Sequence, residues 1–167
     1  MASQSAPSGG YTMQIDTSQI KRWAAKVDSE SSKEIQKFIT LALKNSAVIV
    51  HHQESKEVPR GVTGKLAKSI KETVTTLAAV IGPDHNLKYA IYVEKGTKPH
   101  MPPVDAITEW ANKKGINPWA LAMSIKQKGT QANPFVERTF KKTKDEVMAT
   151  WVETTKLIRD FLAEASR

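Results

Sequence analysis

The four histidines are the side chains of this sequence best suited to chemistry, since imidazole binds metal ions and transfers protons near neutral pH. They are His51, His52, His85 and His100. His51 and His52 are adjacent, so on a helix their side chains point ~100° apart and chelate one ion poorly. The sequence has no His-Glu-x-x-His pattern and no cysteine, and we therefore predict no metal site.

Phosphate and acid–base chemistry are also weakly represented. Val62-Thr-Gly-Lys65 resembles the end of a phosphate-binding loop, but a proline replaces the first glycine of that motif and Leu66 replaces its hydroxyl residue. Glu94, Asp105 and Glu109 are acid–base candidates only by default, and the i, i+4 spacing of the last two is typical of a solvated helix face. Without a nucleophile elbow, we predict no catalytic residue, no cofactor and no enzymatic activity.

The positive charge is concentrated in the middle of the chain. The 167 residues include 25 Lys+Arg and 17 Asp+Glu, a net charge of +8. Residues 56–128 carry twelve Lys/Arg and six Asp/Glu, a net charge of +6. This distribution predicts one basic face on a folded body, directed at a polyanion or at an acidic protein. The alternative is a solvated surface that keeps the protein soluble.

The N-terminal third predicts an arm followed by two helices. Residues 1–12 are rich in Ser, Gly, Ala and Pro and are expected to form a flexible arm, without the features of a signal peptide. Asp16 or Thr17 is expected to cap a first helix. The apolar residues of that helix are Ile20, Trp23, Ala24 and Val27. A second helix is expected from Ser31 or Ser32 to about 52–54, with one apolar stripe. The stripe consists of Ile35, Phe38, Ile39 and Ala42, widened by Leu41, Val48 and Val50.

The middle of the chain predicts shorter elements. A helix over residues 63–70 is expected to be capped by Thr63 and to bury Leu66 and Ile70. The β-branched segment 73–81 predicts a strand, and 82–86 predicts a turn. Residues 87–95 fit a strand by composition, or a short helix with Gly96 after its C-terminus.

The C-terminal half predicts helices that begin near prolines. Pro103 and Pro118 fit the first turns of helices over 104–114 and 119–128, and Pro134, with Asn133 as cap, fits the first turn of a long last helix. Its expected buried stripe is Phe140, Val147, Met148, Trp151, Val152, Ile158, Phe161 and Leu162. The fold class is therefore α+β, with a small, mostly antiparallel sheet packed against long N- and C-terminal helices, as one domain over 13–167. The longest apolar runs reach four and five residues. A membrane span needs ~20, and we expect no membrane partner.

Three segments in sequence order carry a family resemblance. The first is Pro59-Arg-Gly-Val-Thr-Gly-Lys-Leu-Ala-Lys-Ser-Ile70, which follows a helix. The second is Tyr89-Ala-Ile-Tyr-Val-Glu-Lys-Gly-Thr-Lys-Pro-His100, and the third is Gly129-Thr-Gln-Ala-Asn-Pro-Phe-Val-Glu-Arg-Thr-Phe140, which leads into the last helix. Together they resemble the tail-completion (tail-terminator) proteins of tailed bacteriophages over residues 30–150. The motif after Phe135 departs mildly, since Val136 stands where leucine is common.

The resemblance implies a structural role. Such proteins form a ring, commonly of six subunits, on the head-proximal end of the tail tube. The ring ends tube polymerisation and joins the tail to the head-closure complex. The implied partners are other copies of the chain, the tail tube protein and the head-closure (connector) protein, with DNA passing through the lumen without specific recognition. The implied location is the tail or neck of the virion, after assembly in the host cytoplasm.

Two sets of residues are candidates for these contacts. The irregular segment of Gly96, Thr97, Lys98, Pro99, His100, Met101 and Pro102 is the expected subunit or partner interface, because loops on a rigid scaffold carry contacts. Tyr89, Tyr92, Val93, Pro134 and Phe135 are instead expected in the core.

The second set is Lys65, Lys68 and Lys71, expected along one helix edge and facing an acidic partner or DNA. Because DNA must slide through such a ring, the acidic partner is the preferred alternative.

Two rival functions stay open at this stage. A non-specific DNA-binding protein would account for the +8 charge and for the lysines near helix C-termini, which also complement helix dipoles. Those lysines are Lys113, Lys114, Lys126 and Lys128. A neighbouring neck component, such as a head-closure or adaptor protein, would share the small α+β style.

Overall fold

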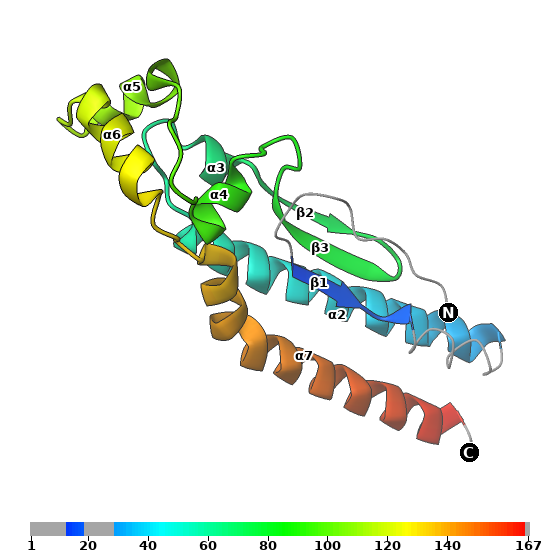
Figure 1. The fold of residues 1–167 in the computed structure, drawn as a ribbon. Helices are drawn as coiled ribbons and strands as arrows, with labels where there is room; N and C mark the ends of the chain where they lie inside the picture. Colours follow the sequence, from blue (N-terminus) through cyan, green and yellow to red (C-terminus); the bar gives the residue numbers. More distant parts are fainter. Residues whose placement is uncertain (1–12, 19–28, 166–167) are drawn as a thin grey trace.

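The computed structural model describes residues 13–18 and 29–165 (Figure 1). Three strands and six helices are assigned within these residues. In chain order they are β1 (Met13–Asp16), α2 (Ser29–Glu57), α3 (Lys65–Lys68), β2 (Ile70–Val74), β3 (Ala78–Pro83), α4 (Ala90–Lys95), α5 (Val104–Lys113), α6 (Pro118–Lys128) and α7 (Phe135–Ala165).

The sheet has the strand order β1-β3-β2, and both pairings are antiparallel. Met13 pairs with Ile81 on one side of β3, and Ile70 pairs with Pro83 on the other. Figure 1 shows α2 and α7 running antiparallel, with the sheet against α2 and the small helices α3 to α6 around one end of the long pair. The predicted α+β class, with a small antiparallel sheet packed against long helices, is confirmed.

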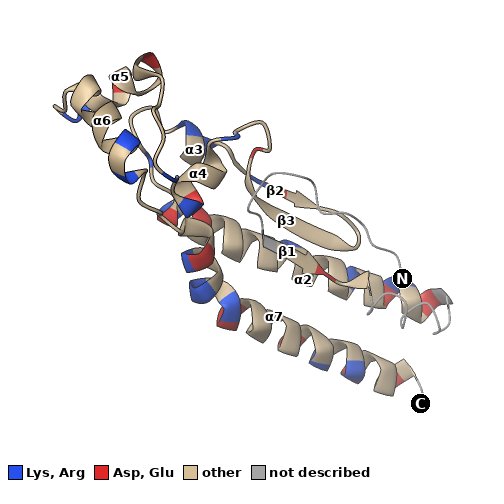
Figure 2. Cartoon of the chain, in the orientation of Figure 1, with Lys and Arg blue, Asp and Glu red and all other residues tan. Residues whose placement is uncertain are grey.

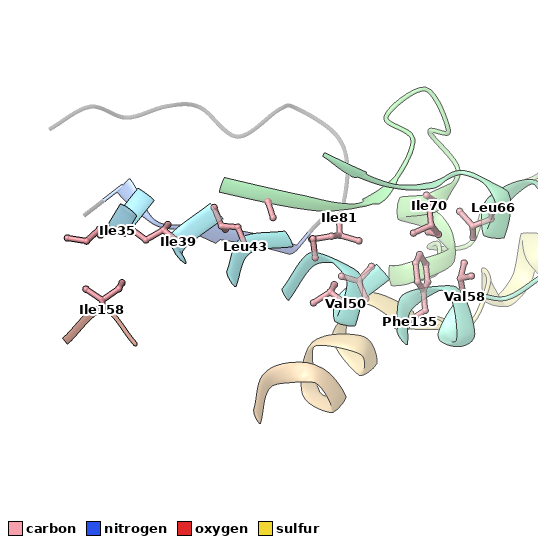
Figure 3. Packing of buried hydrophobic residues seen from close by; sticks show 14 residues of the cluster. Ile35, Ile39, Leu43, Val50, Val58, Leu66, Ile70, Ile81, Phe135 and Ile158 are labelled. Atoms are coloured by element: carbon pink, nitrogen blue, oxygen red, sulfur yellow. The ribbon is translucent and has the colours of Figure 1, made fainter. Parts of the chain in front are cut away.

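The core runs along α2. Ile35, Ile39 and Leu43 are fully buried and share a cluster with Ile81 of β3 and Phe135 of α7 (Figure 3). Their spacing of four residues gives one apolar side of the helix, which explains why α2 forms where the stripe was predicted. The helix begins two residues before the expected start and ends at Glu57.

Two residues expected to widen the α2 stripe are instead exposed. Leu41 is 57% exposed and Val48 is 58% exposed. They lie seven residues apart, on the side of the helix away from the core stripe. The prediction was wrong because apolar type alone does not assign a residue to the buried side of a helix.

The buried side of α7 is built largely from threonines. Thr139, Thr143 and Thr154 are buried, and their hydroxyls donate to backbone carbonyls four residues earlier at 2.8–2.9 Å. Ile158 is buried as expected. Three residues of the expected stripe are more than half exposed, which corrects that part of the prediction. They are Phe140, Met148 and Val152. The internal hydrogen bonds let the threonines pack against α2 as small, nearly apolar surfaces.

The segment predicted as one strand over 73–81 is a hairpin. β2 ends at Val74, β3 begins at Ala78, and Thr75 closes the turn. The Thr75 N–H donates to the Ala78 carbonyl at 2.8 Å, and the Ala78 N–H donates to Thr75 Oγ1 at 3.0 Å. The turn contains no Gly, Asn, Asp or Pro, so the residues that usually mark a hairpin are missing.

The helix predicted over 63–70 is only one turn long. The N-cap is Gly64, while the Thr63 hydroxyl accepts from the Lys65 N–H at 3.4 Å. The helix ends at Lys68 because both the N–H and the hydroxyl of Ser69 donate to Leu66 O, and Ile70 enters β2. Leu66 and Ile70 are buried, as predicted, although from different elements.

The N-terminal region also differs from its prediction. Residues 13–16 form β1, an edge strand that was not predicted, while the predicted cap residue Asp16 ends this strand and Ser18 is already helical. The Asp16 carboxylate accepts from the Ser18 N–H at 2.8 Å, a cap-like contact. The expected arm over 1–12 and the expected helical stripe from Ile20 to Val27 lie outside the described residues.

The structure decides between strand and helix for residues 87–95. Residues 90–95 are helical, and Gly96 follows with a φ of 71°. α5 and α6 begin and end within two residues of their predicted bounds, and the Asn117 side chain caps α6 by accepting from the N–H groups of Trp119 and Ala120.

Candidate functional site

The second and third family-like segments meet at a tight crossing. Thr97 and Thr130 form an antiparallel bridge in which each N–H donates to the other's carbonyl, at 3.1 and 3.2 Å. Their hydroxyl oxygens lie 3.0 Å apart. A Cβ on Gly96 would lie 2.3 Å from Thr130 O, and one on Gly129 would lie 1.9 Å from Thr97 O. Only glycine permits this approach, so both glycines are needed to bring the segments together.

The crossing separates α5 and α6 from the rest of the described chain. We call residues 98–128, which leave and re-enter through this crossing, the α5–α6 arm. Figure 1 shows the arm projecting from the end of the molecule where α2 ends and α7 begins. α5 and α6 pack on each other, with Ala111 and Ala122 fully buried.

The predicted interface segment, residues 96–102, forms the base of the arm. Lys98, Pro99, His100 and Met101 are exposed, whereas Pro102 is buried. The His100 ring is hydrogen-bonded through Nδ1 to Lys98 O at 2.9 Å. The segment therefore presents four consecutive side chains to solvent while its two ends are fixed.

A shallow hollow lies beside this segment. It is lined by residues of α4, α5, α6 and the crossing, among them Tyr92, Val93, His100, Ile107, Ile125 and Thr130. Tyr89 and Tyr92 were expected in the core, but they are 43% and 58% exposed. Phe135 is buried as expected. Tyr92 lies on a six-residue helix and Tyr89 is its N-cap residue, while the inward side of this helix is occupied by Ala90 and Glu94.

Sequence reasoning missed the apolar surface of the arm itself. Trp110 is 40% exposed, Trp119 is 60% exposed, and Met101 and Ile116 are also exposed. The lysines near the helix ends lie on the same arm, and Figure 2 shows Lys and Arg bands on α6 and α3. The available signal was two tryptophans on predicted helices of only ten and eleven residues, too short to bury both. Exposed tryptophan is typical of the centre of a protein contact surface, and charged side chains are typical of its polar rim.

Glu94 holds the arm's base to the long helices. Its carboxylate is buried and accepts from the N–H of Val136 at 3.0 Å and of Glu137 at 3.2 Å, the first turn of α7. The Asn133 N–H donates to Val93 O at 2.9 Å. The expected cap, the Asn133 side chain, accepts instead from Arg138 Nη2 at 2.7 Å. A default acid–base candidate is therefore a long-range helix cap.

Two further carboxylates of α2 lie at this junction and have opposite environments. Glu57 accepts from Lys142 Nζ at 2.5 Å and from Arg138 Nε at 3.1 Å, and these hydrogen bonds, Lys142 first, lower its pKa. Glu54 is fully buried and neither carboxylate oxygen has a hydrogen-bond partner. Burial, and then the charge of Glu94, raise the pKa of Glu54 to about 7.

The three predicted contact lysines do not lie on one helix edge. Lys65 and Lys68 are exposed on α3, but Lys71 lies on β2. Lys71 Nζ is 2.5 Å from Asp84 Oδ2, and this bond is the main reason that the pKa of Asp84 falls to about 2. The three lysines are separated because α3 ends at Lys68, before Lys71. Only Lys65 and Lys68 remain as a pair on one helix.

The other chemical candidates stay apart. Asp105 and Glu109 are exposed on α5, and Glu109 pairs with Lys113 at 3.6 Å. Within residues 13–18 and 29–165, no group of three His, Asp or Glu side chains is arranged to hold a metal ion. None of the helices that the structure describes is both long and apolar enough to cross a membrane.

Comparison with known proteins relates part of the chain to a protein family. Residues 21–96, somewhat under half of the chain, match the family model described as "Bacteriophage HK97-gp10, putative tail-component". No curated protein and no solved structure matches the chain. Over this stretch, from before α2 to the glycine at the crossing, the chain is similar to a phage tail component. This confirms the predicted resemblance at that coarser level.

Proposed function

We propose that the chain is a tail-completion protein, which forms a ring on the head-proximal end of a phage tail tube, ends tube polymerisation and joins the tail to the head-closure complex. The observation that carries the proposal is the match of residues 21–96 to a phage tail component. The third motif adds support from outside the matched stretch, because Thr130 and the first turn of α7 pack directly on Gly96 and Glu94.

The proposed mechanism is docking and capping without chemistry. A ring that continues the packing of the tube on one face, and differs on the other, stops further tube subunits from adding. The proposed partners are other copies of the chain, the tube protein and the head-closure protein. DNA passes through the ring without sequence-specific recognition. The proposed location is the virion tail or neck, after assembly in the host cytoplasm.

Residues 96–102 and the α5–α6 arm are the proposed partner contact. Lys98, His100 and Met101 are exposed, and so are Trp110 and Trp119 of the same projecting arm. Aromatic residues and methionine are enriched at protein interfaces, with charged residues at the polar rim, and the fixed base of the arm limits the entropy lost on docking.

The test is tube assembly with and without the chain. Tail tube protein from the same phage, polymerised alone, should give tubes of uncontrolled length by negative-stain microscopy, and addition of the chain should give short tubes with a ring at one end. Lys98→Glu with Met101→Glu should abolish capping. Lys88→Glu with Leu77→Glu, a matched exposed pair near the β-hairpin, should leave it intact. Unchanged tube lengths on addition of the wild-type chain would reject the proposal.

A separate experiment tests whether the basic residues of α3 face a protein partner or the DNA. Lys65→Gln with Lys68→Gln should weaken docking to tubes if these lysines face an acidic protein partner. Normal docking with altered DNA ejection would assign them to the lumen. Lys71 is left unchanged, because its removal would also free Asp84.

A non-specific DNA-binding protein is the second candidate, favoured by the net charge of +8. It predicts duplex binding by the isolated chain with an affinity that falls steeply with salt, since neutralised phosphates release counterions. A third candidate, a head-closure or adaptor protein, predicts binding to the head connector without any change in tube length.

A further inference from the structure

The two long helices carry exposed stripes of opposite charge. On α2, the stripe is Lys33, Lys37, Leu41, Lys44 and Val48, which we call the basic stripe. On α7, it is Glu146, Glu153, Leu157, Asp160 and Glu164, the acidic stripe. In each stripe the spacings of three, four or seven residues keep the side chains on one side of the helix.

Each stripe has an exposed leucine among its charges. Leu41 is 57% exposed and Leu157 is 51% exposed. An apolar side chain flanked by charges of one sign is suited to a partner surface with an apolar centre and the opposite sign. Charges of the opposite sign lie beside members of each stripe, and Glu30 and Glu34 are on the same side of α2 as the basic stripe. Lys37 pairs with Glu34, Arg159 pairs with Asp160, and Lys156 with Arg159 lines a separate hollow beside Met148.

We propose that the basic stripe of one copy of the chain packs against the acidic stripe of the next copy. The proposal deepens the ring proposed above and rests on it. The charges decide the kind of contact, because a stripe facing its own copy would place lysines on lysines or carboxylates on carboxylates. A contact between two different surfaces is head-to-tail, and such contacts repeat around a ring when the rotation closes.

The spacing of the charges along the two stripes also fits the proposed contact. α2 and α7 run antiparallel within a copy, and copies related by rotation about an axis along these helices keep them antiparallel (Figure 1). Lys33 and Lys44 are eleven residues apart, as are Glu153 and Glu164, ~16 Å along each helix. With Leu41 opposite Leu157, this register sets Lys44 against Glu153 and Lys37 against Asp160. The remaining lysine, Lys33, then faces Glu164.

The absence of cysteine makes a direct test possible, because every introduced thiol is unique. The chain with both Leu41→Cys and Leu157→Cys should cross-link under mild oxidation into a ladder of covalent oligomers, alone or on tube ends. Each single variant should give almost no cross-link with itself, and a mixture of the two should give dimers only. Efficient self-linking of Leu41→Cys alone would overturn the head-to-tail contact.

The second test is charge reversal. Assembly of the variants is measured by mass photometry or as rings on tube ends. Lys37→Glu with Lys44→Glu should reduce assembly at least tenfold, and so should Glu153→Lys with Glu164→Lys. Mixing the two variants should restore assembly, since each stripe then meets its opposite. Lys88→Glu with Lys144→Glu, two exposed lysines outside both stripes and the α5–α6 arm, is the control of equal charge change and should assemble normally.

The outcomes separate this contact from the proposed function. Capped tubes without cross-linking of the double cysteine chain, or with charge-reversed variants that assemble normally, would overturn the contact and leave tail completion standing. A wild-type chain that neither assembles nor caps tubes would overturn both.

Discussion

At the scale of single residues, Gly96 and Gly129 decide whether the chain can close the base of its α5–α6 arm. Each backbone lies so close to the opposite strand that a methyl group would meet a carbonyl oxygen. Both glycines also have positive φ, 71° and 73°. Two independent requirements, space and backbone conformation, therefore exclude other residues.

Gly129→Ala tests the space requirement against a matched control. Gly115 has a similar φ of 68° but nothing within 4 Å of its added Cβ. Gly115→Ala should cost only the strain of the left-handed conformation, about 1–2 kcal/mol. Gly129→Ala should lower the free energy of unfolding by about 2 kcal/mol more, measured by urea denaturation, because the crossing must open. Equal costs would show that the crossing is loose.

Glu54 is the second decisive residue, because it is fully buried without a hydrogen-bond partner. Its pKa is about 7 in the folded chain and 4.5 ordinarily. The folded state therefore holds a proton that the unfolded chain releases between these values, and stability falls as pH rises from 4.5 to 7. The loss amounts to about 3 kcal/mol.

Glu54→Gln should remove this pH dependence. The free energy of unfolding of the wild type should decline between pH 5 and 7.5, and that of the variant should be flatter by about 3 kcal/mol over the same range. Glu109→Gln, on the surface of α5, is the control that loses an exposed carboxylate. Parallel pH profiles for the wild type and Glu54→Gln would contradict the assignment.

At the scale of elements, the start of α7 is stabilised by a side chain from another helix. The carboxylate of Glu94 satisfies two N–H groups of the first turn, and its negative charge lies at the positive end of the helix dipole. The same charge contributes to the raised pKa of Glu54. One side chain thus connects α4, α7 and α2.

Glu94→Ala should therefore act across elements. It removes the cap and leaves the buried Val136 N–H without an acceptor, and we expect a loss of about 2–3 kcal/mol in unfolding free energy. Hydrogen exchange should rise in the first turn of α7 and at the crossing. Asn117→Ala removes a local cap of α6 and should cost about 1 kcal/mol, with faster exchange confined to α6. Unchanged exchange at residues 135–137 in Glu94→Ala would refute the long-range cap.

At the scale of the whole molecule, the long helices with the sheet and the α5–α6 arm are two parts joined at the crossing. The main cluster of buried apolar residues contains residues of α2, α3, α4, α7 and the sheet, while Ala111 and Ala122 of the arm lie outside it. Stability and partner contact can therefore change independently.

Replacement of residues 98–128 by a short Gly-Ser linker should leave a cooperatively folding chain. We expect the helical far-UV signal of α2 and α7 to remain and Tm to fall by only a few degrees, because the main cluster is intact. Capping of tail tubes should be lost. The control is the full-length chain with Trp110→Ala and Trp119→Ala. This variant should fold like the wild type and dock poorly to tail tubes. Loss of cooperative unfolding on removal of the arm would show that the arm is part of the core.

The sequence by itself determined the elements with strong local signals. The stripe of Ile35 and Ile39 predicted α2, Pro118 predicted the start of α6, and the three motifs carried the resemblance to a phage tail component. Each depends on residues close in sequence, whose spacing or backbone restriction acts wherever the chain is placed. The interface segment 96–102 was identified by its prolines and glycine, and its role stays a proposal.

Only the tertiary structure decided which residues meet. Gly96 lies against Thr130, Glu94 caps α7 and Lys71 binds Asp84 because distant segments pack together, and no local pattern encodes those distances. The same holds for burial. Leu41 and Tyr92 are apolar or aromatic yet exposed, while Glu54 and the threonines of α7 are buried, since the sides of α2, α4 and α7 are assigned by their neighbours. Among the carboxylates that suggested chemistry, Glu94 is a long-range cap of α7, while Asp105 and Glu109 lie on the exposed side of α5.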